Sequence, residues 1–173
     1  MAKQKNPWIK YLVILGIALV LLLISFLKNR RYQQETSLVF DLKKEDITAI
    51  SIMSSEDTVS FRQLNDTTWT PIEPDTGDIN VTKVNRLITG LVELKQTGIP
   101  TENPEKHTTY NVNSGSTLID LKKGEDVLES FYLGRSKSSF SHGYLRFKGE
   151  NTVYRINKNL SYLARPNPEA WQQ

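Results

Sequence analysis

The residues most able to do chemistry are two histidines, His107 and His142, because the 173-residue chain contains no cysteine. His142 directly follows Ser141, and Asp120 lies on a predicted strand earlier in the chain. A serine hydrolase needs its histidine within hydrogen-bond reach of the serine, but adjacent residues on a strand or turn point apart. The nucleophile-elbow motif Gly-x-Ser-x-Gly is also absent. We therefore expect no catalytic residue and no enzyme activity.

A metal site is the second kind of chemistry that histidines suggest. Zinc is held by cysteine, histidine and carboxylate ligands, often at short and regular spacings. The chain has no HExxH motif and no two histidines four residues apart, so carboxylates would have to complete such a site. We expect neither a metal nor a cofactor.

The segment 134–139 (GRSKSS) has the composition of an anion-binding loop, with one glycine, two cations and three hydroxyl groups. It lacks the GxxxxGK[ST] spacing of a nucleotide-binding loop, and a predicted strand hairpin rather than a helix follows it. A solvated hairpin loop is the simpler interpretation. Arg135, Ser136 and Lys137 are still the best candidates for contacts with an acidic partner or polymer. Trp171 is a further candidate, which either anchors a partner or folds back onto its own domain.

The stretch from Trp8 to Leu27 is the element around which the rest of the chain is organised. After Lys10 it contains 17 residues without a charge. Because an α-helix rises about 1.5 Å per residue, such a run just crosses a hydrocarbon core of about 30 Å. A buried core helix would need more polar surface, and a cleaved signal peptide would need a small-residue cleavage site. We predict an uncleaved transmembrane signal-anchor, with anchoring residues Trp8, Tyr11, Gly16, Ala18, Leu27, Lys28, Arg30 and Arg31.

The positive charges on the two sides of the predicted span nearly balance. Lys3, Lys5, Lys10 and the free amine precede it, and three basic residues follow it. Positive residues favour the cytoplasmic side, and the amine together with the very short N-terminal segment favours an N-terminus inside. We therefore expect the rest of the chain to lie outside the cytoplasm.

The net charge of +3 belongs to the flanks of the predicted span. Residues 1–31 carry six of the 22 Lys and Arg residues and none of the 19 Asp and Glu residues. The 16 basic and 19 acidic residues that follow give a net charge of −3. Phosphate contacts dominate affinity for nucleic acid, and this part of the sequence has no basic stripe to make them. We do not expect nucleic acid as a partner.

The apolar pattern after the span alternates between two periods. Runs of period two predict three strands between residues 47 and 72 and four strands between residues 117 and 156. Between them, apolar residues three and four apart predict an amphipathic helix over 81–94, capped by Asn80 or Asp78 and closed by Gly98 and Pro100. The order of elements predicts an α+β fold, in which one main helix covers a small antiparallel sheet.

The predicted organisation has four parts. A basic segment and transmembrane signal-anchor occupy residues 1–31, and a linker occupies residues 32–36. An α+β ectodomain follows over residues 37–164, and its last part, residues 160–164, fits a short terminal helix. Residues 165–173 form a C-terminal tail.

The order of these cues resembles a bacterial domain-of-unknown-function family over about residues 37–160. The segments that carry the resemblance are Asp46-Ile47-Thr48-Ala49-Ile50, Trp69, Val84-Asn85-Arg86-Leu87, Tyr110-Asn111-Val112, Tyr132-Leu133-Gly134-Arg135, Gly143-Tyr144-Leu145-Arg146-Phe147 and Val153-Tyr154-Arg155-Ile156. Where this chain has Tyr110-Asn111-Val112, the family usually has Tyr-Gly-Leu. The family occurs as repeats in membrane-anchored proteins and beside auxiliary proteins of gliding-motility-type ABC transporters. The resemblance implies an extracytoplasmic, non-enzymatic accessory domain.

Taken together, these patterns predict a non-catalytic, single-pass protein of a bacterial cytoplasmic (inner) membrane. Its expected partners are the lipid bilayer and other subunits of a membrane or envelope complex, for which it acts as scaffold or accessory subunit. The alternative is a ligand-recognition module that binds an envelope glycan or anion through the loop Gly134–Gly143.

Overall fold

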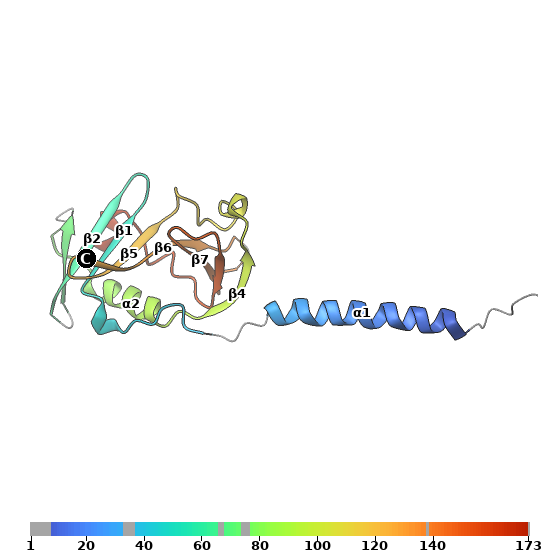
Figure 1. The fold of residues 1–173 in the computed structure, drawn as a ribbon. Helices are drawn as coiled ribbons and strands as arrows, with labels where there is room; N and C mark the ends of the chain where they lie inside the picture. The colour runs from blue at the N-terminus through green and yellow to red at the C-terminus, as the bar shows by residue number, and fades with distance from the viewer. Residues whose placement is uncertain (1–7, 33–36, 66–67, 74–76, 138, 173) are drawn as a thin grey trace, which may run out of the picture. The chain divides into compact units, whose positions relative to one another are not determined.

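A computed structural model describes residues 8–32, 37–65, 68–73, 77–137 and 139–172 of the chain, without the side chains of residues 9, 26–32 and 73. The chain divides into two compact units, residues 1–34 and residues 35–173. The first unit contains helix α1, and the second contains a sheet and helix α2 (Figure 1). The predicted linker, residues 32–36, lies almost wholly outside the described residues.

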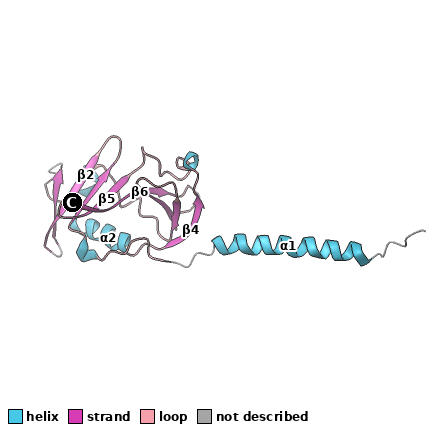
Figure 2. Ribbon diagram, viewed as in Figure 1, coloured by secondary structure: helices cyan, strands magenta, loops and turns pink. Residues whose placement is uncertain are grey.

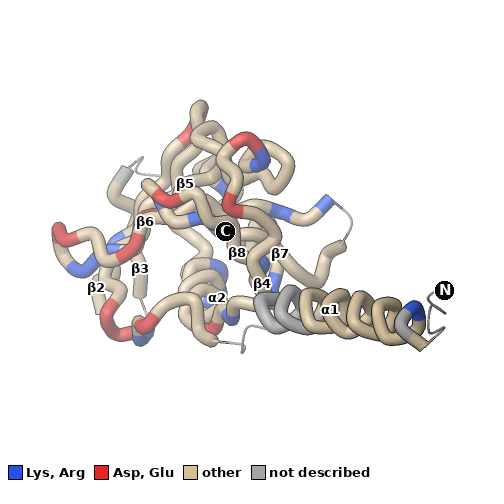
Figure 3. Tube along the Cα trace, turned by 45° about the vertical axis from the view of Figure 1, so that its right-hand side comes forward, with Lys and Arg blue, Asp and Glu red and all other residues tan. Residues whose placement is uncertain are grey.

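Helix α1 (Trp8–Tyr32) is 25 residues long and contains the whole apolar run. From Lys10 to Ser25 every side chain is exposed, and Figure 3 shows no charged residue along the middle turns. The candidate anchoring residues beyond Ser25 belong to α1, but their side chains lie outside the described part: Leu27, Lys28, Arg30 and Arg31. Among the described residues, no helix has the length and apolar character required of a membrane span, so the transmembrane anchor stays a prediction.

The second unit is built on one antiparallel sheet of eight strands, with order β3-β2-β1-β5-β6-β7-β8-β4. The strands are β1 (Ala49–Met53), β2 (Thr58–Asn65), β3 (Thr68–Glu73), β4 (Gln96–Thr101), β5 (Leu118–Lys123), β6 (Asp126–Arg135), β7 (Gly143–Phe147) and β8 (Val153–Ile156). Two meanders, β1–β3 and β5–β8, meet where β1 pairs with β5. The predicted α+β class with an antiparallel sheet is confirmed (Figure 2).

Helix α2 (Val81–Val92) packs its apolar face against this sheet. The Asn80 side chain accepts a hydrogen bond from the backbone nitrogen of Lys83 at 3.0 Å, which confirms the predicted cap. The apolar side chains at the predicted spacing are fully buried, namely Val84, Leu87, Ile88 and Leu91. Burying each of them contributes about 2 kcal/mol of transfer free energy, so packing rather than propensity holds the helix. The helix ends at Val92, two residues before the predicted end.

Strand β4 (Gln96–Thr101) is the one strand of the sheet that the sequence pattern did not predict. It contains Gly98 and Pro100, which we expected to close the preceding helix, and it pairs with β8 through two register shifts. An edge strand tolerates proline and glycine because one side makes no ladder hydrogen bonds. Arg155 supplements the irregular pairing, since its guanidinium donates to the hydroxyl and carbonyl oxygens of Thr97 at 3.1 and 3.2 Å.

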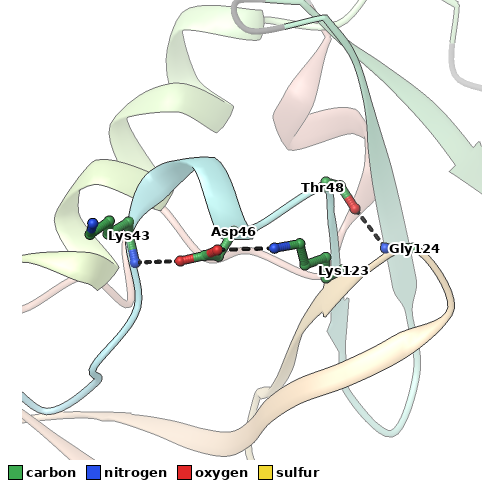
Figure 4. A network of polar contacts seen from close by, with 5 residues as sticks. All are labelled: Lys43, Asp46, Thr48, Lys123 and Gly124. Carbon is green, nitrogen blue, oxygen red and sulfur yellow. Dashed lines mark hydrogen bonds and ion pairs between the residues drawn. The ribbon is translucent and has the colours of Figure 1, made fainter.

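A polar network fastens the β5–β6 turn to the short 3₁₀-helix η1 (Lys44–Asp46) (Figure 4). Asp46 accepts hydrogen bonds from the Lys123 ammonium and from the backbone nitrogen of Lys43, each at 3.1 Å. The hydrogen bond from Lys123 is the main cause of the lowered pKa of Asp46. Beside it, the backbone nitrogen of Gly124 donates to the Thr48 hydroxyl at 2.7 Å. The network fixes the start of the first meander relative to the second.

Residues 102–117 form the connector between β4 and β5, and the connector crosses β6 at Gly134. A Cβ atom on Gly134 would lie 2.2 Å from the carbonyl oxygen of Tyr110 and 2.9 Å from that of Asn111. Only glycine permits so close a crossing of two backbones. Asn111 itself has a φ of 54°, in the left-handed region that asparagine tolerates better than most residues. Asparagine can therefore stand where the resembled family usually has glycine.

Buried polar side chains hold the connector in place. The Arg146 guanidinium donates to the carbonyl oxygens of Val112 at 2.7 Å and Glu150 at 2.8 Å, and it lies 4.4 Å from the centroid of the Tyr132 ring. Carbonyl dipoles and an aromatic face thus compensate the charge of Arg146, a residue that is only 7% exposed. His107 is also buried, with its Nε2 atom 2.9 Å from the carbonyl oxygen of Asn151.

Residues 165–172 of the predicted C-terminal tail (165–173) are instead part of the fold. Trp171 ends the 3₁₀-helix η3 (Pro168–Trp171) and is fully buried, with its ring centroid 4.8 Å from that of Phe61. Its indole nitrogen donates to the carbonyl oxygen of Arg165 at 2.7 Å, and its own carbonyl oxygen accepts from the backbone nitrogen of Asn80. Residues 161–163, expected to be helical, form a turn. Pro166 and Pro168 suggested that the chain leaves the domain here, but the segment that contains them leads Trp171 into the core.

Gly134→Ala should lower the free energy of unfolding by about 3 kcal/mol, because the added methyl group would displace the connector. Gly115→Ala is the matched control, since the nearest atom to its new Cβ would be 3.9 Å away. We expect the control to stay within about 0.5 kcal/mol of the parent protein. Urea denaturation of the full chain in non-ionic detergent measures both values. Equal stability of the two variants would contradict the backbone crossing.

Candidate functional site

An open cleft of about 1100 Å³ lies beside the loop that joins β6 to β7. Three cationic side chains line it, those of Arg135, Lys137 and Arg165, and no aspartate or glutamate is among its described lining residues. The remaining walls present side-chain amides from three asparagines, several hydroxyl groups, and the aromatic rings of Phe140 and Tyr162. The cleft can therefore offer charge-assisted and neutral hydrogen bonds to a polar, anionic ligand.

The crossing of the connector over β6 positions the first part of this cleft. Gly134 fixes Tyr110 and Asn111 above β6, and the amide nitrogen of Asn111 then donates to the carbonyl oxygen of Arg135 at 3.2 Å. On the connector itself, the Ser116 hydroxyl donates to the amide oxygen of Asn113 at 2.7 Å. Hydrogen bonds between the connector and β6, and within the connector, thus hold this part of the cleft wall in place.

The loop after Arg135 is organised by its own serines. The backbone nitrogen of Ser139 donates to the Ser136 hydroxyl at 3.2 Å, and the hydroxyl oxygens of Ser139 and Ser141 lie 2.8 Å apart. Phe140, between these two serines, is 97% exposed. The ring lines the cleft together with Lys137, so it can offer apolar surface to a ligand there.

The structure places the sequence-predicted site residues as follows. Arg135, Ser136 and Lys137 all line the cleft, whereas Trp171 is buried in the core and is not available to a partner. Arg165 and Tyr162 complete the cleft, and sequence reasoning did not single out either of them. They lie about thirty residues after Arg135 in sequence, and no local pattern around them indicates which segment they would face.

The residues weighed for catalysis each contact a different group. His142 has its Nε2 atom 3.5 Å from the Tyr144 hydroxyl and packs edge-on against that ring, with centroids 5.7 Å apart. Ser141 contacts Ser139, and Asp120 accepts a hydrogen bond from the Ser130 hydroxyl at 2.6 Å. Among the described residues, no group of three or more histidines and carboxylates is placed to hold a metal ion.

Comparison with known proteins identifies the family of this chain. Residues 69–173, from β3 to the C-terminus, match a family described as a domain of unknown function (DUF4340). No curated protein and no solved structure matches the chain. The predicted resemblance to an uncharacterised domain family is confirmed at that level. Because the match covers more than half of the sequence, the chain belongs to the DUF4340 family of domains of unknown function.

Proposed function

We propose that this protein is a single-pass membrane protein in which α1 anchors a non-catalytic binding domain. The observation that carries the proposal is the surface of α1, whose large apolar side chains between Leu12 and Ile24 are 54–66% exposed. A helix that is apolar on all sides is stable where its surroundings are apolar, as lipid chains are. In water the same surface would favour aggregation.

In this proposal the N-terminus lies in the cytoplasm and the sheet domain lies outside the cytoplasmic (inner) membrane of a bacterium. The domain acts as scaffold or accessory subunit of a larger membrane or envelope complex. Gly16 and Ala18, both exposed on α1, lie about 200° apart around the helix, so each would let a different neighbouring transmembrane helix approach closely. The resemblance described above supports complexes of the gliding-motility ABC-transporter type as the setting.

The double substitution Leu15→Lys with Leu19→Lys should move the protein out of the membrane fraction. Each lysine near the middle of a span costs about 3 kcal/mol on insertion scales. Carbonate-washed membranes, assayed by immunoblotting, measure the distribution. Lys10→Ala is the control and should stay in the membrane, because Lys10 lies at the start of the run. A parent protein found in the soluble fraction would overturn the anchor.

The accessory-subunit role predicts stable partners in native membranes. We expect purification of the tagged full-length protein in mild detergent to recover other membrane subunits in stoichiometric amounts, identified by mass spectrometry. The Leu15→Lys, Leu19→Lys variant should lose them, since it no longer reaches the bilayer. A parent protein that elutes alone and as a monomer would count against the role.

A second candidate function, ligand recognition, is favoured by the lining of the cleft. Arg135, Lys137 and Arg165 face one hollow without a described carboxylate beside them, so their charges remain available to an anion. Such a site suits an envelope glycan or a small anion.

Replacing both Arg135 and Lys137 with alanine should weaken binding of inorganic phosphate or digalacturonate by tenfold or more, because hydrogen bonds to charged groups are the strong ones. Isothermal titration of the full chain in non-ionic detergent measures the change. Lys148→Ala is the control, since Lys148 is exposed and lies outside the lining of the cleft. If the parent protein binds neither probe, or if the double variant binds as well as the parent, ligand recognition by this loop is wrong.

A further inference from the structure

A second hollow, of about 600 Å³, adjoins the cleft. Lys83 and Arg86 of α2 line it, together with Arg165 and Tyr162, and these last two residues also line the cleft. A single arginine and a single tyrosine thus form a wall common to both hollows. The two hollows are therefore neighbours along one surface, and a ligand longer than the cleft can continue into the second.

The charge along this surface has one sign. Five cations line the two hollows, and we name them the cationic track: Lys137, Arg135, Arg165, Lys83 and Arg86. Neither hollow has a described aspartate or glutamate in its lining. The chain after residue 31 has a net charge of −3, so the charge of the track is opposite in sign to the net charge of the domain. Concentrating one sign of charge in a hollow raises the local concentration of oppositely charged ligands.

Lys83 is held in place by the C-terminal segment. Its ammonium donates to the carbonyl oxygen of Ala170 and lies 4.8 Å from the centroid of the Trp171 ring. Burial is the main cause of the lowered pKa of Lys83, and the nearby charge of Arg165 is the second cause. Two like charges are therefore positioned close together, and an anion bound between them would relieve their repulsion.

The track also offers aromatic and polar surface to the body of a ligand. Tyr162 is 55% exposed at the wall that joins the hollows, and Phe140 projects beside Lys137. The asparagine amides and serine hydroxyls of the cleft can both donate and accept hydrogen bonds, as sugar hydroxyls do. Binding sites of this kind combine aromatic surface with a few polar groups that fix orientation.

From these observations we propose that the cationic track binds a linear acidic polysaccharide. Carboxylates along the polymer would pair with the five cations, while sugar rings would lie against Tyr162 and Phe140. The proposal rests on the ligand-recognition function and extends it from one cleft to a polymer site that includes α2. Single-stranded nucleic acid also combines negative charge with stacking surfaces, and it is the competing ligand that the test must separate.

The test compares oligogalacturonates of two and eight units on the full chain in non-ionic detergent, with neutral dextran and an eight-nucleotide oligothymidylate as comparison ligands. We expect the octamer to bind at least fivefold more tightly than the dimer, and dextran not to bind. Arg86→Ala and Arg165→Ala together should abolish most of the gain from length, about fivefold, in line with exposed charge pairs. Arg62→Ala is the matched control, because Arg62 is exposed on β2 and lines neither hollow.

The outcomes separate this proposal from the function on which it rests. If dimer and octamer bind equally and both depend on Arg135 and Lys137, the cleft recognises ligands but the track is wrong. If the oligothymidylate binds as tightly as the octamer, the assignment to polysaccharides is wrong. If no oligogalacturonate binds while phosphate does, the polymer is excluded and the cleft remains a small-anion site. Unchanged octamer binding by the Arg86, Arg165 double variant would also overturn the track.

Discussion

The close crossing of the connector over Gly134 is the constraint on which the second half of the domain depends. At this point two backbones approach so closely that even a methyl group at residue 134 would collide with the carbonyl oxygen of Tyr110. The crossing places Val112 against the sheet, where its carbonyl oxygen accepts from the buried Arg146. A buried arginine is costly unless its donors are satisfied, so the connector and β7 stabilise each other.

The same crossing gives the candidate site its shape. Asn111, in the left-handed conformation, lines the cleft and bonds to the backbone of Arg135, while Arg165 comes from the segment that leads Trp171 into the core. The cleft therefore lies between two segments that are each fixed by buried contacts. Binding sites on such supports lose little conformational entropy when a ligand arrives, which favours affinity.

The periodic spacing of apolar residues in the sequence predicted those helices and strands that bury side chains on one face at regular intervals. The spacing of Val84, Leu87 and Leu91 indicated α2, and β8 was predicted with its observed bounds, because both elements bury one face. Strand β4 was missed since Gly98 and Pro100 are typical of a helix end as well as of an irregular edge strand. The loop residues Arg135 and Lys137 were predicted from composition alone. Arg165, Tyr162 and the burial of Trp171 depend on contacts distant in sequence, for which the chain carries no local pattern.

The pairing of β1 with β5 has a consequence for how the domain is made. Residues 54–117, which number 64, separate these strands, and Phe61 contacts Trp171, which lies 110 positions further along the chain. Contacts of such long range slow folding, because loop-closure entropy must be overcome before they form. During synthesis α2 can cover part of the first meander early, but Phe61 lacks its contact with Trp171 until the C-terminal segment emerges. Incompletely folded chains of this kind are substrates for chaperones. If synthesis stalled before β5, the edge of β1 that pairs with β5 would stay open to aggregation.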